Sequence, residues 1–207
     1  MTAIREIWRS WQTGDRLQFA GEFYSHTLMT PVFVPEASQL PLPPIYLAAV
    51  GPKMCETAGS VGDGFIAHPF STPRFLTEVT LPAIARGAAL AGRGLADVRI
   101  CAKSFVAVGE TDAEVGAACR RVKRQIAFYA STPAYRPVLD LHGWGDLQQT
   151  LSTLSRQGRW DEMGDLIDAD VLHAFAAVGS PKEAAAEVRR RFDGLADSLI
   201  VLGAGEY

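Results

Sequence analysis

The triplet Gly51-Pro52-Lys53 follows an apolar run and is the first place in the sequence where residue types suggest ligand chemistry. Gly51 would let a ligand approach the backbone closely, and Pro52 suits the first position of a helix. Free amides at a helix N-terminus attract anions, whereas Lys53 in the first turn opposes the helix dipole. A bound anion would resolve that conflict. The alternative is an ordinary helix start with a solvated lysine, and the triplet alone does not decide between them.

The residues His68, Pro69, Phe70 and Ser71 follow the next apolar run and form a second candidate position. A histidine that leaves a strand there could donate a hydrogen bond to a substrate or act as an acid or base. It could equally be a structural histidine, so His68 is only a candidate catalytic residue. Lys103, inside a third apolar run, either points into a polar interior or lies at a strand end.

Other types of site lack support in the sequence. His26, His142 and His173 show no metal-ligand spacing, so we expect no metal site. The chain contains no GxSxG, no P-loop and no GxGxxG motif. These absences disfavour hydrolase, nucleoside triphosphatase and Rossmann dinucleotide-binding functions.

The composition is that of a soluble globular protein. Of 207 residues, 48% are hydrophobic and 21% are charged, which argues against a disordered chain. The formal net charge of -3 gives no global attraction for nucleic acid or anionic membranes, so we expect neither partner. Cys55, Cys101 and Cys119 form no CxxC pair and read as reduced thiols. No apolar run reaches the ~18 residues of a membrane span. We therefore expect a cytoplasmic protein.

Four apolar runs, at residues 45–50, 65–67, 100–108 and 198–202, predict strands. Their apolar residues are continuous rather than alternating, which is typical of a parallel sheet covered by helices. Helices with start or stop signals lie before and between the runs. We predict them at 4–13, 52–61, 73–91, after the capping box of Thr111 and Glu114, and from Pro181 to about Phe192.

These elements predict an α/β fold of (β/α) units with about four parallel strands. We expect a single domain over residues 1–207. Residues 112–178 are predicted to form a helical insertion before the last strand. Residues 15–44, interrupted by five prolines, are expected to be irregular.

The stretch PIYLAAVGPKMCETAGSVGDGFIAHP, which starts at Pro44, resembles the luciferase-like monooxygenase superfamily, specifically its branch that uses coenzyme F420. The matching positions are Ala48, Ala49, Gly51, Pro52, Ala58, Gly59, Asp63 and Gly64. The stretches IREIWRSWQTGDRLQFAGEFY, IAFYASTPAYRPVLDLHGWGD and VGSPKEAAAEVRRRFDGLADSLIVL also look like that family, in the same order.

The resemblance implies a (β/α)8 barrel with an insertion, which binds F420 or FMN at its C-terminal mouth. It implies an oxidoreductase that transfers hydride between the deazaflavin and a small organic substrate. By the same likeness, the backbone of Ala49, Val50, Gly51 and Pro52, together with Lys53, would contact the cofactor around its phosphate-bearing tail. His68 and Phe70 match the strand end that faces the substrate pocket in such enzymes.

The chain departs from the family in length. A complete barrel has eight strands and typically ~250 residues, whereas four strands are predicted here. The resemblance begins at the helix after the family's fourth strand, so we expect the C-terminal half of such an enzyme. A truncated or partial chain would lack its N-terminal half; alternatively, the half-barrel completes itself as a homo-oligomer. An FMN-dependent monooxygenase and a non-catalytic half-barrel are the competing predictions.

Overall fold

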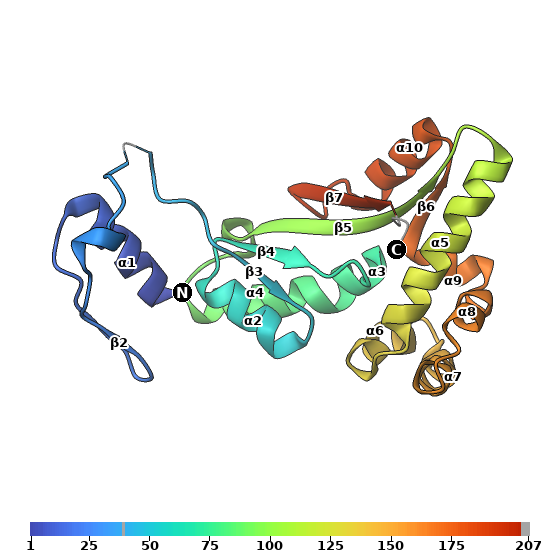
Figure 1. Cartoon of the computed structure of the whole chain (residues 1–207), viewed down its shortest axis with the longest axis horizontal. Helices are drawn as coiled ribbons and strands as arrows, with labels where there is room; N and C mark the ends of the chain where they lie inside the picture. Colours follow the sequence, from blue (N-terminus) through green and yellow to red (C-terminus); the bar gives the residue numbers. More distant parts are fainter. Residues whose placement is uncertain (39, 204–207) are drawn as a thin grey trace.

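A computed structural model describes residues 1–38 and 40–203 of the chain. The molecule is elongated (Figure 1). An N-terminal arm that contains helix α1 (Thr2–Thr13) lies at one end, and a parallel sheet occupies the middle. A group of helices from residues 112–175 lies at the other end.

The sheet has five parallel strands, in the order β3-β4-β5-β6 with β7 paired to β5. They are β3 (Tyr46–Ala49), β4 (Gly64–Ala67), β5 (Arg99–Val108), β6 (Ala176–Gly179) and β7 (Ser198–Gly203). β5 is long enough to hold two partners in succession along one edge: β4 pairs with its beginning and β6 with its end. β7 pairs along the opposite edge. The four predicted strands are confirmed, and β6 is an additional one.

Helices on one face of the sheet connect the strands. They are α2 (Pro52–Val61), α3 (Pro73–Phe75), a π-helical turn (Leu76–Thr80), α4 (Leu81–Leu90) and α10 (Pro181–Phe192). α2 and α4 approach each other backbone to backbone. A Cβ on Gly59 would collide with the carbonyl of Ile84, and a Cβ on Gly87 with the carbonyl of Glu56. Glycine at these two positions therefore sets the spacing of the helix pair that covers β3 and β4.

The opposite face of the sheet, which we call the inner face, is only partly covered. Leu47 and Ala49 pack with α2 and α4, so Tyr46 and Ala48 must point to the other side. On β5, Phe105 packs against the helices of residues 112–175, and Lys103 shares its face by alternation. This inner face leaves Ala48 exposed.

Residues 112–175 form the predicted helical insertion, with one correction at its end. The helices are α5 (Asp112–Ala130), α6 (Arg136–Leu141), α7 (Gly145–Arg156), α8 (Trp160–Met163) and α9 (Ala169–Phe175). The predicted helical boundary at residue 178 was wrong, because Ala176–Gly179 form strand β6 beside the end of β5. That pairing partner is about seventy residues away, so no local signal marks the strand. Among the described helices, none combines the length and apolarity needed to cross a membrane.

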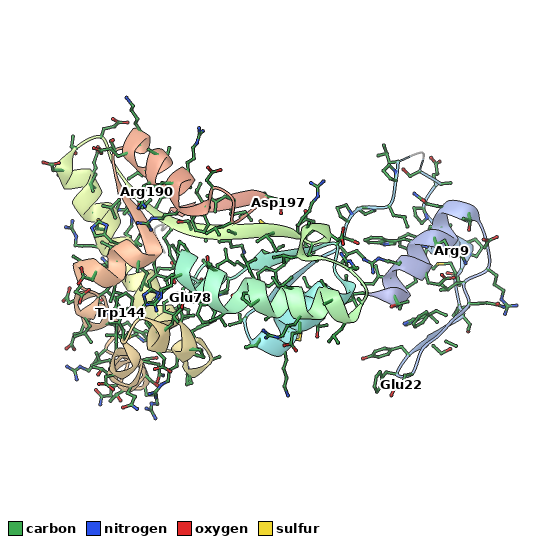
Figure 2. All side chains as sticks on the ribbon, turned by 180° about the vertical axis from the view of Figure 1, so that it is seen from behind. Arg9, Glu22, Glu78, Trp144, Arg190 and Asp197 are labelled. Carbon is green, nitrogen blue, oxygen red and sulfur yellow. The ribbon has the colours of Figure 1, made fainter. Side chains whose placement is uncertain are left out.

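The arm comprises α1 and residues 14–45. Gly14 caps α1 at φ 73°, as predicted. Its described residues are irregular as expected, except for a turn at Pro31–Phe33 and a small hairpin of β1 (Phe19–Ala20) and β2 (Ser25–His26). Figure 2 shows Arg9 and Glu22 in this arm, at the opposite end of the molecule from Trp144. The arm exposes the large apolar side chains of Phe23, Tyr24, Leu28, Val32, Phe33 and Leu40.

Candidate cofactor and substrate site

The turn from β3 into α2 leaves an open space above Gly51. The backbone of Gly51 is extended (φ -80°, ψ 154°), a conformation open to any residue. A Cβ built on Gly51 would meet nothing within 4 Å. Neither conformation nor packing among the described residues therefore requires glycine. A ligand that lies against the backbone would require glycine here, because a Cβ would occupy the space of the ligand.

The first turn of α2 is electropositive and lacks an internal counter-charge. Pro52 occupies its start, no side chain caps the helix, and no acidic residue lies in the first turn. Early amides of a helix have no acceptor within the helix itself. Lys53 is exposed, and in the described part of the chain it has no ion pair. This arrangement suits an anionic group.

The structure brings the ends of β3 and β4 together around a small cavity of about 10 Å³, which has room for about one water molecule. Ala49 and Val50 line it from the first strand, and His68 and Phe70 from the second. Phe75, Thr80 and Val138 close it from the helices. Gly51, Pro52 and Lys53 follow Val50 in the chain, are exposed, and do not line the cavity. Four of the predicted site residues thus line one pocket at the carboxyl ends of parallel strands, where ligands bind in such folds.

His68 is held at both ring nitrogens. The backbone N–H of Phe70 donates to its Nδ1 at 3.1 Å, and its Nε2 lies 3.1 Å from the hydroxyl of Tyr135. The imidazole also stacks on the ring of Tyr135, with centroids 4.6 Å apart, and meets the edge of Tyr129 at 4.9 Å. His68 is therefore fixed in orientation by its neighbours.

Burial, together with a smaller contribution from the nearby charge of Lys103, lowers the pKa of His68 to about 4. The imidazole is neutral at physiological pH. Burial raises the pKa of Tyr135, with a contribution from Tyr129, so that its phenol is protonated. The site thus presents a neutral imidazole and a protonated phenol, and the charge of Lys103 acts on the imidazole.

Phe70 and Lys103 lie in contrasting surroundings. The Phe70 ring is 1% exposed and stacks on Phe175 with centroids 4.4 Å apart, so most of it belongs to the core under the insertion helices. Its backbone N–H, rather than its ring, reaches His68. Lys103 is half-buried on the inner face and has no ion-pair partner in residues 1–38 and 40–203.

A second histidine links the insertion to the end of β4 by a hydrogen bond. His142, which follows α6, has its Nε2 2.8 Å from the hydroxyl of Thr72, and it stacks on Trp144 at 4.6 Å. Thr72 Oγ1 also accepts the N–H of Phe75, which caps α3. The pair joins the helix start after β4 to the α6–α7 connection. In the described residues no group of His, Cys, Asp or Glu side chains could hold a metal ion.

The sequence model of the luciferase-like monooxygenase family matches residues 1–198 of the chain. The chain belongs to the luciferase-like monooxygenase family. The predicted resemblance is confirmed.

Among its relatives, an uncharacterized protein of Mycobacterium tuberculosis is 48% identical over 200 residues, which cover 97% of this chain and 59% of that protein. An F420-dependent glucose-6-phosphate dehydrogenase of Rhodococcus erythropolis is 40% identical over 95 residues, 46% of this chain and 26% of that protein. The luciferase-like chain described here thus spans little more than half the length of the first of these relatives.

Solved structures share the fold. The coenzyme F420 dependent tetrahydromethanopterin reductase of Methanopyrus kandleri superimposes with a TM-score of 0.72 at 20% identity, covering 97% of this chain and 55% of that one. An F420-dependent secondary alcohol dehydrogenase, solved with an F420–acetone adduct, gives a TM-score of 0.60 at 16% identity, covering 93% and 52%. The α/β architecture of the luciferase-like chain is therefore that of these TIM-barrel-like proteins. The parallel sheet of the described residues is open, not a closed barrel.

Tyr135 and Tyr129 are the site residues that the sequence did not single out. Both lie in the stretch IAFYASTPAY, which carried part of the family resemblance. Tyr129 is on α5, and Tyr135 closes the short turn before α6. The only sequence signal for these two residues was a pair of tyrosines in an insertion whose other residues are typical of packed helices.

Proposed function

We propose that this chain forms the C-terminal part of an F420-dependent oxidoreductase of the luciferase-like type. The reaction is hydride transfer between the deazaflavin ring and a small organic substrate. When bound, F420 supplies the atom that accepts or gives the hydride. The residues of this chain bind and orient the two reactants, which lowers the barrier through proximity and placement.

The observation that carries this proposal is the open cradle at Gly51. A Cβ at this position would fill space that no described residue uses. The backbone of Ala49, Val50, Gly51 and Pro52 is proposed to hold the phosphate-bearing tail of the cofactor. Lys53 would add charge attraction at the start of α2. The F420-dependent relatives support the choice of cofactor.

His68 and Phe70 are proposed to shape the substrate side of the site. His68 lines the pocket beside Val50, and Phe70 anchors its strand end in the core while its N–H holds the imidazole. A neutral His68 at physiological pH is a hydrogen-bonding group rather than a cation. Its role as a catalytic acid or base therefore stays a prediction.

A titration of the purified chain with F420 and with FMN, followed by fluorescence, tests the proposal. Saturable binding of F420 with a weaker response to FMN supports it. Tighter binding of FMN would instead favour a flavin-dependent monooxygenase, the second candidate, since solved proteins of similar fold include a Baeyer-Villiger monooxygenase in complex with FMN. Binding of neither at high micromolar concentration would favour a non-catalytic half-barrel.

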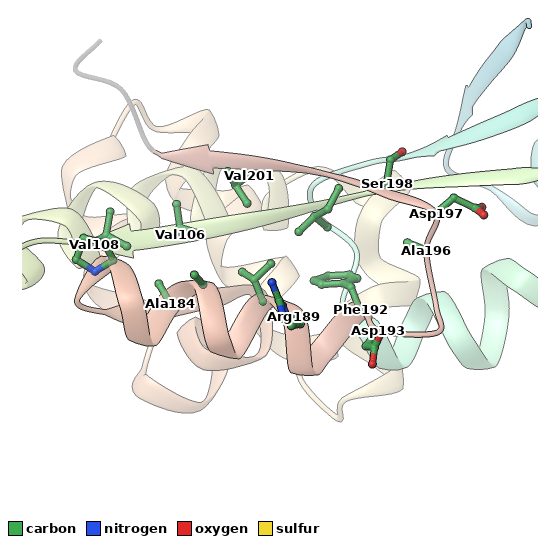
Figure 3. Close-up of a pocket in the computed structure, with 14 residues that line it drawn as sticks. Val106, Val108, Ala184, Arg189, Phe192, Asp193, Ala196, Asp197, Ser198 and Val201 are labelled. Atoms are coloured by element: carbon green, nitrogen blue, oxygen red, sulfur yellow. The ribbon is translucent and has the colours of Figure 1, made fainter.

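We further propose that a second polypeptide covers the sheet, either another copy of this chain or an N-terminal half. The outer edges of β3 and β7 have no strand partner in the described residues. An open groove of about 540 Å³ runs between α10 and the strands β5 and β7, lined mainly by apolar side chains such as Val106, Val201 and Phe192 (Figure 3). Exposed strand edges and apolar surfaces of this kind are normally covered. Light scattering on the purified chain distinguishes a homo-oligomer from a monomer.

We also propose a cytoplasmic location, since Cys55, Cys101 and Cys119 are all free thiols. Cell fractionation tests this: recovery of the protein outside the cytoplasm would contradict it.

A further inference from the structure

The hydrogen bonds around His68 can run in only one direction. The N–H of Phe70 must donate, so Nδ1 of His68 must be an unprotonated acceptor at 3.1 Å. A neutral imidazole carries one proton, which then lies on Nε2. The hydroxyl oxygen of Tyr135, 3.1 Å from Nε2, is therefore the acceptor of that proton. This assignment follows from donor and acceptor chemistry alone.

This direction of the hydrogen bonds leaves the hydroxyl proton of Tyr135 without a role in the contact with His68. A phenol has one proton and accepts through its oxygen lone pairs. Since the oxygen already accepts from His68, the O–H is free to donate to another group. Within residues 1–38 and 40–203, the only hydrogen-bond partner of the Tyr135 hydroxyl is His68. The Tyr135 side chain is half-buried, and a donor in such surroundings favours a partner.

We propose that the Tyr135 hydroxyl donates a hydrogen bond to a carbonyl oxygen of the substrate, with His68 as its positioning residue. The inference rests on the proposed oxidoreductase function and adds a substrate class, namely compounds that present a carbonyl oxygen. A donor aimed at that oxygen favours the electron-rich oxygen that develops when hydride adds to the carbonyl carbon. Lys103 lies close enough to His68 for its charge to be felt there, and it favours the same developing negative charge.

The first experiment tests the direction of the hydrogen bonds and needs neither cofactor nor substrate. In ¹⁵N-histidine NMR spectra at pH 7, the His68 signals are assigned by their loss in His68→Gln. We expect a neutral ring with its proton on Nε2. A proton on Nδ1 of a neutral ring would overturn the proposal, because Nε2 would then accept the Tyr135 proton. A charged ring would overturn it too, because its Nδ1 could not accept the N–H of Phe70.

The second experiment tests the ligand contact with acetophenone as the carbonyl probe and ethylbenzene as its oxygen-free counterpart. Binding is measured by saturation-transfer NMR, with and without F420. Tyr135→Phe should weaken acetophenone binding about fivefold, the loss of one neutral hydrogen bond, and leave ethylbenzene binding unchanged. Tyr24→Phe removes an exposed hydroxyl in the arm and serves as the matched control. Equal acetophenone affinity in wild type and Tyr135→Phe, or no acetophenone binding by the wild type, would overturn the proposal.

The positioning role of His68 predicts a rescue. His68→Leu removes the donor to Tyr135 and should weaken acetophenone binding as Tyr135→Phe does, whereas His68→Gln retains an N–H donor and should recover part of the affinity. F420 affinity is measured on the same variants. Failure of the wild type to bind F420 refutes the proposed function, while the tautomer and the acetophenone comparison still decide the role of Tyr135.

Discussion

Gly51 offers the sharpest test of whether the backbone of residues 49–52 binds the cofactor tail. When no ligand is bound, the structure has room for a side chain at this position. The substitution Gly51→Ala places a methyl group where no described atom lies within 4 Å. Alanine fits the extended backbone of this residue and lowers the conformational entropy of the unfolded chain. This stabilises the folded chain by about 0.4–1 kcal/mol. Alanine is also a poorer N-cap than glycine, by about a few tenths to 1 kcal/mol. We expect these terms to offset, so that the free energy of unfolding changes by less than about 1 kcal/mol.

The effect on binding should be much larger. If the cofactor tail lies against the backbone of Gly51, the methyl group occupies its space. Overpacking a close contact costs about 1–3 kcal/mol. At about 1.4 kcal/mol per tenfold change, this weakens F420 binding by about 5- to 150-fold. The larger side chain of Gly51→Val should weaken it further.

The assay compares F420 dissociation constants from fluorescence titration with unfolding free energies from urea denaturation. Gly116→Ala is the matched control, because it lies in α5 and its Cβ would meet only Arg120 Nη1 at 3.7 Å. This control should leave F420 affinity unchanged. Wild-type affinity in Gly51→Ala and Gly51→Val would refute the cradle. A large loss of stability in Gly51→Ala would refute the claim that the space is free in the folded chain.

Lys53→Ala should weaken F420 binding about fivefold at low salt and reduce the dependence of binding on salt. Lys182, which likewise follows a proline at a helix start, is the control, and Lys182→Ala should change neither. Equal effects of the two variants would exclude a local role of Lys53 in F420 binding. Because the pKa of folded His68 is about 4, below its usual 6.5, the unfolded chain binds the proton more readily between these values. Stability should therefore fall as the pH drops from 6.5 toward 4, and His68→Gln should show a smaller loss between pH 7 and pH 5 in urea unfolding; an identical loss would contradict the assignment. Gly87→Ala should destabilise the chain by about 3 kcal/mol in the same assay, since its Cβ collides with the Glu56 carbonyl; an unchanged unfolding midpoint would show that α2 and α4 can separate freely.

The helix starts could be predicted from sequence because their causes are local. Thr111 and Glu114 form a reciprocal capping box, and Ser180 and Glu183 form another, with Pro181 at the first helical position. Each box uses atoms within four residues of one another, so the pattern of residue types contains the interaction. The strands between such helices were found for a related reason, since buried parallel strands have continuous apolar runs.

The partners within the site could not be predicted in the same way. His68 and Tyr135 are 67 residues apart in sequence, and Thr72 and His142 are 70 apart. Their contacts depend on how the insertion packs over the ends of β4 and β5, which residue spacing does not encode. The ring of Phe70 illustrates the same limit. Its position after a strand suggested a pocket residue, yet packing on Phe175 places most of the ring in the core.

Lys103 connects the uncovered sheet to the chemistry of the site. Residue spacing left two options for this lysine, and the alternation along β5 places it on the inner face, beside the exposed Ile200 of β7. Any polypeptide that closes over this face removes water from the ammonium group. Burying a charge without a partner is costly, so closure favours a ligand that brings an electron-rich oxygen to Lys103. Covering the sheet and binding a carbonyl substrate should therefore reinforce each other, and a chain with its inner face open should bind such a ligand more weakly than the same chain within a closed assembly.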